Sequence, residues 1–244
     1  MIQKETEMTN KKPNSKKKTK PLKGAKRCIN LIVLDKSGSM DSMRREAVDA
    51  FNEQIEEIKK HNDKIPTKIC LVTFSSTVDD PVFWNVDVDK IEKLTIEKYV
   101  PNGMTAMRDA VSYGIKRINE LPESSKEDTA ILVQVISDGM ENNSKNTSAS
   151  DLSELVQSCQ KTNRWTITYL GANQDLSKVS AQTSIHAGST LAFSATASGM
   201  KRASGINSQA LNCFYSKLSC STEMSVSEFY KDIESSDKKD SSGT

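Results

Sequence analysis

Long apolar runs are missing from this sequence. No stretch approaches the roughly 18 consecutive apolar residues that mark a membrane-spanning helix. The opening decapeptide MIQKETEMTN also lacks the apolar core of a secretory signal. We therefore expect a protein that is not inserted in a membrane and that resides inside the cell, in the cytoplasm.

Histidine and paired cysteine are also scarce. His61 and His186 are the two histidines, so few side chains could serve as the base of a serine hydrolase. The five cysteines form no C-x-x-C pair, and several stand in apolar surroundings. This usage favours buried free thiols in a reducing compartment over a disulfide framework.

Charge is distributed unevenly along an otherwise ordinary composition. The 244 residues are 36% hydrophobic and 27% charged, as expected for one soluble domain with tails. Residues 1–27 carry a net charge of +8, whereas the whole chain carries +2. We expect 1–27 to be a disordered basic tail, which either aids solubility or weakly contacts nucleic acid or another polyanion. The domain is predicted at 28–220, followed by a partly disordered segment at 221–244.

Short apolar segments alternate with amphipathic ones along the domain. The predicted strands are 28–34, 67–75, 129–137, 165–170 and 191–193, with a short antiparallel edge strand at 81–88. Helices are predicted after a cap at Asp41 or Ser42, after Thr105, and at 148–161, 176–186 and 209–219. This order predicts an α/β fold with a doubly wound, mainly parallel sheet, one antiparallel edge strand, and helices on both faces.

Asp35 ends the first predicted strand, and a loop with two serines follows it. Ser37 and Ser39 alternate with Gly38, which we expect to let the backbone turn so that both hydroxyls face one point. Loops at the carboxyl ends of strands hold the ligands of open α/β sheets. Oxygen donors of this kind suit a hard divalent cation, magnesium before calcium.

Two more loops should supply oxygen atoms at the same edge. Thr105 precedes a predicted helix, and Asp138 directly follows the strand 129–137. We expect Asp35, Ser37, Ser39, Thr105 and Asp138 to form one six-coordinate site, completed by water or an outside ligand. If the carboxylates act through water, the inner shell is mostly neutral hydroxyls. The cation would then keep enough charge to bind an acidic group on a partner protein.

The segments LIVLDKSGSM, PNGMTAMRDA and QVISDGMEN, in that order, resemble the von Willebrand factor A domain and its metal-ion-dependent adhesion site. The resemblance covers about 28–220 and implies a Rossmann-like sheet with magnesium or manganese at its top face. It also implies that Ser37, Ser39 and Thr105 coordinate the metal directly or exchange with water, while Asp35 and Asp138 act mostly through water. The sequences at 168–175 (TYLGANQD) and 137–144 (SDGMENNS) are similar to those of compact stand-alone A domains in bacterial and phage genomes.

Three other interpretations of the first loop fail on particular residues. A calcium-binding EF-hand would need glycine in place of Met40 and a helix in place of the preceding strand. An aspartyl phosphatase would want a second aspartate at Ser37. A serine hydrolase would need a histidine near the site, and the sequence has neither a G-x-S-x-G elbow nor a phosphate-binding loop.

Two functions of different class follow from these residues. The first is a metal-dependent protein-binding module, in which Mg²⁺ or Mn²⁺ coordinates an Asp or Glu carboxylate of a partner. The second is a magnesium-dependent hydrolase or phosphatase, or an accessory subunit of a nucleotide-driven complex. No catalytic constellation is visible, so we expect no enzymatic activity. Asp109 is expected to be a buried carboxylate that ties its helix to the site loops, and Trp84 and Trp165 to pack in or beside the core.

Overall fold

The computed structural model describes residues 24–220, 226–231 and 233. Within these residues the chain forms one six-stranded sheet in the order β3-β2-β1-β4-β5-β6. The strands are β1 (Arg27–Asp35), β2 (Thr67–Phe74), β3 (Phe83–Asp87), β4 (Thr129–Ser137), β5 (Trp165–Ala172) and β6 (Thr190–Phe193). Neighbouring strands are parallel except β2 and β3, which confirms the predicted antiparallel edge strand.

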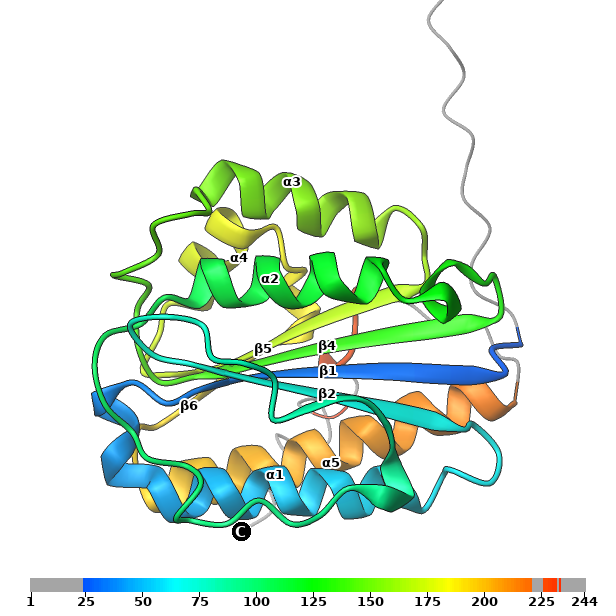
Figure 1. Cartoon of the computed structure of the whole chain (residues 1–244), viewed down its shortest axis with the longest axis horizontal. Coiled ribbons are helices and arrows are strands. Elements are labelled where there is room, and N and C mark those ends of the chain that lie inside the picture. The colour runs from blue at the N-terminus through cyan, green and yellow to red at the C-terminus, as the bar shows by residue number, and fades with distance from the viewer. Residues whose placement is uncertain (1–23, 221–225, 232, 234–244) are drawn as a thin grey trace, which may run out of the picture.

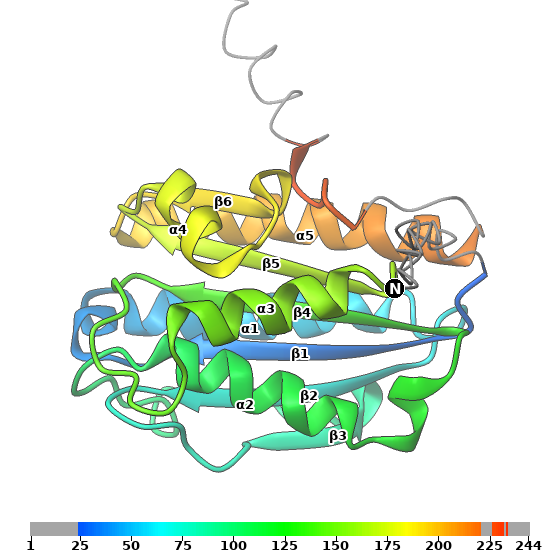
Figure 2. The ribbon, with the colours of Figure 1, turned by 90° about the horizontal axis from the view of Figure 1, so that it is seen from above.

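Helices cover both faces of this sheet, as the sequence predicts (Figures 1 and 2). Helices α2 (Met107–Asn119), α3 (Ala149–Gln160) and α4 (Leu176–Thr183) lie on one face, and α1 (Arg44–Lys59) and α5 (Ala197–Ser219) lie on the other. Each layer encloses its own apolar cluster, because the side chains of a strand alternate between the two faces. The strands β1 and β4 are buried on both faces and therefore consist of nearly continuous apolar runs.

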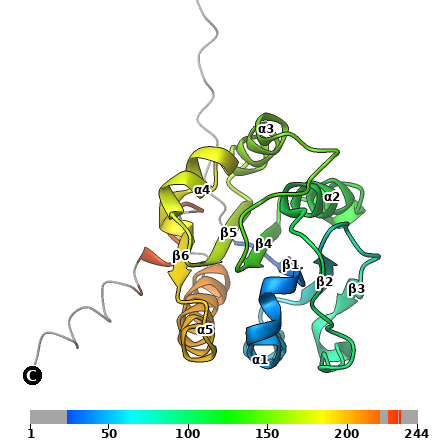
Figure 3. The same cartoon turned by 90° about the vertical axis from the view of Figure 1, so that its left-hand side faces the viewer.

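The strand order reverses between β1 and β4, and this reversal positions the site. From β1 the chain winds through α1 to β2 on one side, and the later strands β4, β5 and β6 follow on the other. Open α/β sheets bind ligands at such a switch point, beyond the carboxyl ends of the strands. Figure 3 looks onto this edge, where β1 ends at Asp35 and β4 ends at Ser137.

The first helix begins later than predicted. A 3₁₀ helix at Gly38–Met43 follows the loop, and α1 begins at Arg44, so the predicted cap at Asp41 or Ser42 was wrong. Residues three apart eclipse one another in a 3₁₀ helix, and Met40 and Met43 use this spacing to enter the core together.

Three later boundaries also differ from the prediction. Strand β5 extends to Ala172, because Gly171 pairs with both neighbouring strands. Helix α4 ends at Thr183, where Ser184 takes a left-handed conformation. Helix α5 starts at Ala197, twelve residues before the predicted segment, and its first half buries small and polar residues such as Ala203 and Asn207. That half carries no apolar stripe for a sequence pattern to detect.

Three of the five cysteines are buried as the sequence predicts, and two are not. Cys28, Cys70 and Cys159 are buried free thiols as expected, and burial raises the pKa of Cys28 and Cys70 to about 12. Cys213 and Cys220 are also free thiols, but they are exposed, so the predicted burial was wrong for these two. Among the described residues, no helix has the length and apolar character to cross a membrane. Residues 1–23 of the predicted basic tail and most of 221–244 lie outside the described residues.

Candidate metal centre

Asp35 ends β1 with its side chain completely buried. Its Oδ1 accepts a hydrogen bond from the Ser37 backbone N–H at 2.7 Å, and its Oδ2 accepts one from Ser137 Oγ at 2.6 Å. Burial raises the pKa of Asp35 from 3.8 to about 6, against the lowering effect of these hydrogen bonds. The charge of Asp138 raises it further. Both oxygens of the Asp35 carboxylate therefore accept hydrogen bonds from groups inside the protein.

Ser37, Ser39 and Asp138 form a chain of short polar contacts across the switch point. Ser37 Oγ lies 3.2 Å from Ser39 Oγ, and Ser39 Oγ donates to Asp138 Oδ1 at 2.6 Å. Burial raises the pKa of Asp138, and the hydrogen bond from Ser39 opposes that shift. The structure therefore joins the loop after β1 to the loop after β4 through hydroxyl and carboxylate oxygens.

Thr105 reaches the same point from the loop before α2. A Cβ placed on Gly139 would lie 2.7 Å from Thr105 Oγ1, so the threonine hydroxyl packs directly against the residue after Asp138. The Thr105 backbone N–H donates to Asn142 Oδ1 at 2.9 Å, and the Asn142 N–H donates back to the Thr105 carbonyl at 3.1 Å. All five predicted site residues thus lie at one edge of the sheet.

At this edge the backbone requires glycine at Gly103 and not at Gly38, the predicted position. Gly38 has an ordinary backbone conformation, and its Cβ would meet nothing closer than the Gly103 carbonyl at 3.5 Å. Gly103 instead has φ of +71°, and a Cβ there would lie 2.5 Å from Ser76 Oγ. The turn that requires a left-handed backbone therefore belongs to the second loop, and the Gly38 N–H donates to the Gly103 carbonyl at 3.0 Å.

The donors present suit a divalent cation. The centre offers three hydroxyls and two carboxylates, which are oxygen ligands without sulfur or imidazole. A divalent cation would stabilise the ionised forms of Asp35 and Asp138, whose pKa values burial raises. In the part of the chain that the structure describes, no three carboxylate, histidine or cysteine side chains gather into a metal cluster.

The family of the chain follows from its sequence over this fold and these loops. The sequence model of the von Willebrand factor type A domain matches residues 31–201, which include all three loops. The chain belongs to this family. Domains of this family are mostly binding modules rather than enzymes, and they often hold a divalent metal.

Two solved structures share the A-domain fold with this chain. Proximal thread matrix protein 1 from the mussel byssus matches with a TM-score of 0.51 and 16% identity, over 77% of this chain and 48% of that chain. The D319A mutant of the PilB minor pilin from Streptococcus sanguinis matches with a TM-score of 0.52 and 14% identity, over 80% of this chain and 64% of that chain. The chain thus spans about half to two thirds of these proteins. A comparison with curated proteins gave no match.

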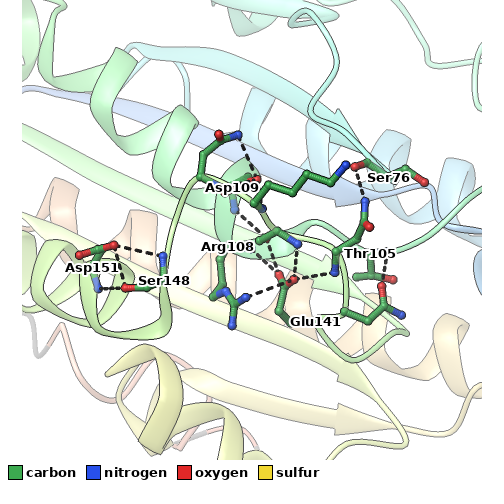
Figure 4. A network of polar contacts seen from close by, with 12 residues as sticks. Ser76, Thr105, Arg108, Asp109, Glu141, Ser148 and Asp151 are labelled. Atoms are coloured by element: carbon green, nitrogen blue, oxygen red, sulfur yellow. Dashed lines mark hydrogen bonds and ion pairs between the residues drawn. The ribbon is translucent and has the colours of Figure 1, made fainter.

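A carboxylate that no sequence pattern singles out organises the loop after β4 of this A domain. Glu141 accepts hydrogen bonds from the backbone N–H groups of Arg108 and Ser144 at 2.8 and 2.7 Å, and from Ser144 Oγ at 2.7 Å (Figure 4). It thereby fixes this loop to the first turn of α2. Asp109 accepts from the Lys145 and Asn146 backbone N–H groups at 2.8 and 3.1 Å, which confirms its predicted tying role. It is half-buried rather than buried, since the loop that it binds lies at the surface.

Two further hydroxyls support Asp35 and were not singled out from the sequence. Ser137 donates to its side chain, and buried Tyr99 donates to its backbone carbonyl. Arg44 in turn donates to the Tyr99 carbonyl at 2.7 Å, which links the start of α1 to the site. Leu34 pairs with Ile136 in the parallel register, so the residues that follow them, Asp35 and Ser137, lie side by side on neighbouring strands.

The two histidines lie away from this edge of the A domain. His61 follows α1 and stacks on Tyr215 with 5.4 Å between ring centroids. His186 precedes the amino end of β6, at the opposite end of the sheet from the site. Trp165 is buried in the core, and Trp84 lies at its edge beneath the Arg117 guanidinium, so both tryptophans pack as predicted. None of these four side chains is available to the three loops.

Gly139→Ala is expected to weaken metal binding at this edge at least tenfold. The added Cβ would press on Thr105 Oγ1 and displace the hydroxyl, with a cost in stability of about 1–3 kcal/mol. Gly38→Ala is the matched control, because its Cβ would find ordinary contact distances. Mg²⁺ titration calorimetry on both variants measures the difference. Equal affinities in the two variants would show that the packing of Thr105 against Gly139 is unimportant.

Proposed function

We propose that Asp35, Ser37, Ser39, Thr105 and Asp138 hold a Mg²⁺ or Mn²⁺ ion and that a carboxylate of a partner protein completes its coordination. The observation that carries this proposal is the chain of contacts from Ser37 through Ser39 to Asp138, with Thr105 beside it. We also propose that 28–220 holds nearly all of the domain, because the elements from β1 to α5 lie almost entirely within it, although Ala25, Phe229, Tyr230 and Ile233 also pack in its core.

The chemistry of the five residues favours an acidic ligand. Both Asp35 oxygens accept hydrogen bonds inside the protein, and Asp138 Oδ1 accepts one from Ser39, so these carboxylates act on the ion mostly through water. When bound, the cation supplies a partly unneutralised positive charge. The three hydroxyls hold it in place without quenching that charge, and an Asp or Glu side chain can then occupy the open position.

The same contacts argue against a phosphatase. An aspartyl phosphatase needs a second aspartate two positions after the nucleophile, and Ser37 stands there, with its backbone N–H donating to Asp35 Oδ1. Both histidines lie at the other end of the sheet. The structure therefore offers support for binding and none for hydrolysis by these residues.

Thr105→Ala is expected to abolish magnesium-dependent capture of partner proteins, and Thr105→Ser is expected to retain it. Serine keeps the hydroxyl, whereas alanine removes one of three neutral donors. The measurement is a pull-down from the cell's own lysate with immobilised full-length protein, in Mg²⁺ or in chelator, with free acetate as competitor. Bound proteins that are unchanged by chelator, by acetate and by Thr105→Ala would contradict a metal–carboxylate contact.

A further inference from the structure

Large hydrophobic side chains are exposed at few positions of the described chain, and most of these lie beside the candidate metal centre. Val82, Val100, Met104 and Met140 are the described large hydrophobic residues that are more than about two-fifths exposed. Three of them lie on the loops that carry Thr105 and Asp138. Exposed apolar side chains that gather around a site mark an interaction surface more often than those scattered singly.

The two methionines flank the point where the two loops meet. Met104 directly precedes Thr105, and Met140 directly follows Gly139, the pair whose contact brings the loops together. Each methionine is therefore one residue, or roughly 3.8 Å of chain, from that contact. Met140 is 70% exposed and Met104 is 45% exposed, so both side chains project from the edge into solvent.

Hydrogen bonds fix the backbone that presents these side chains. The Met104 N–H donates to Ser76 Oγ at 2.9 Å. Beside Met140, the Gly139 carbonyl accepts from Gln174 Nε2 at 2.7 Å. Because the backbone is already fixed, a partner that covers these methionines orders only their side-chain rotamers and not the loops that carry them.

Resting on the function proposed above, we infer that the partner's carboxylate is flanked by apolar side chains, which pack on an apolar rim formed by Val100, Met104 and Met140. The metal ion provides one strong polar contact and the rim provides the apolar area around it. Methionine adapts its shape to different neighbours and is enriched at protein interfaces. The rim therefore selects a class of acidic segment, Asp or Glu among aliphatic or aromatic residues, over an acidic segment in polar surroundings.

Three pools of capped heptapeptides test this inference on the full-length protein. The first has a central Glu flanked by Leu, Ile, Val, Phe and Met, the second has a central Glu flanked by Ser, Thr, Asn and Gly, and the third repeats the first with Gln for Glu. The variants are Met104→Ser with Met140→Ser, and Val82→Ser as the control. Val82 is a suitable control because it is exposed beside the middle of β2, where its N–H donates to the Leu71 carbonyl.

In Mg²⁺, the first pool is expected to bind at least tenfold more tightly than the second, and the third is expected not to bind. The double variant should lose this preference while its Mg²⁺ affinity stays within twofold of the unaltered protein, and Val82→Ser should behave as the unaltered protein. Equal binding of the first two pools, or no pool binding although Mg²⁺ binds, would overturn the inference. Failure of the unaltered protein to bind Mg²⁺ would instead overturn the proposed function.

Discussion

Asp35→Asn is expected to stabilise the metal-free domain by about 3 kcal/mol at pH 7.5. Burial raises the pKa of Asp35 to about 6, so at pH 7.5 the folded domain holds a charge that unfolding would release to water. A rise of roughly two units corresponds to this free energy. Asparagine can keep both contacts: its Oδ1 accepts from the Ser37 N–H, and its Nδ2 can donate to Ser137, whose hydroxyl can turn to the Gly139 carbonyl at 3.1 Å.

The sign of the pH dependence follows from the raised pKa. The stability contributed by protonated Asp35 is complete below pH 3.8 and is lost as the pH rises through about 6. Urea unfolding in chelator at pH 5.0 and 7.5 should therefore show that the gain from Asp35→Asn is larger at pH 7.5. Asp41→Asn, which alters an exposed carboxylate in the 3₁₀ helix that follows this loop, should change stability by less than about 0.5 kcal/mol. Destabilisation by Asp35→Asn at pH 7.5 would refute this account of the buried charge.

Gln134→Leu is expected to destabilise the domain by about 3–5 kcal/mol. Gln134 lies buried in β4, where its Oε1 accepts from Asn30 Nδ2 at 3.1 Å and also from Gln54. Its Nε2 donates to Asn207 Oδ1 at 3.0 Å. Leucine has nearly the same size but would leave the side-chain N–H groups of Asn30 and Gln54 without an acceptor, at about 1–3 kcal/mol each before relaxation, whereas Asn207 Oδ1 would still accept from Tyr230. This amide cluster joins β1 and β4 to α1 and α5.

Gln160→Leu provides the matched control for this second prediction. Gln160 is also a buried glutamine, but its described hydrogen bonds go to the backbone carbonyls of Val156 and Ser184, and its own Oε1 has no partner among the described residues. The same substitution there should cost less than about 1.5 kcal/mol. Denaturant unfolding of both variants gives the comparison. A loss for Gln134→Leu no greater than that for Gln160→Leu would show that the amide cluster contributes little to stability.

Much of the fold could be predicted because its central strands are buried on both faces. Strands β1 and β4 are apolar runs that end at polar residues, and such runs leave little choice of structure. The first half of α5 escaped prediction because it faces the sheet with alanine, serine and asparagine. Burial of such residues depends on contacts such as Asn207 with Gln134, which lie 73 positions apart and are invisible to local periodicity.

The convergence of the candidate site was predictable for a similar reason. Asp35 ends β1 and Asp138 directly follows its parallel neighbour β4, and strand ends that neighbour one another bring their loops together. The supporting residues were not predictable from spacing. Glu141 and Tyr99 act through the conformation of irregular loops, which no periodic pattern encodes. The glycine requirement shifted from Gly38 to Gly103 for the same reason, because φ at a loop position is set by tertiary contacts.

The most direct test of the metal centre is titration calorimetry of Mg²⁺ and Mn²⁺ on the unaltered protein, Asp138→Ala and Asp41→Asn. Excess acetate should be present to supply the missing carboxylate, and circular dichroism should confirm that each variant is folded. We predict binding of one ion to the unaltered protein and to Asp41→Asn, and a loss of about 100-fold or more in Asp138→Ala. Equal affinity in all three proteins, or no binding to the unaltered protein in acetate, would contradict a metal-dependent function at this edge.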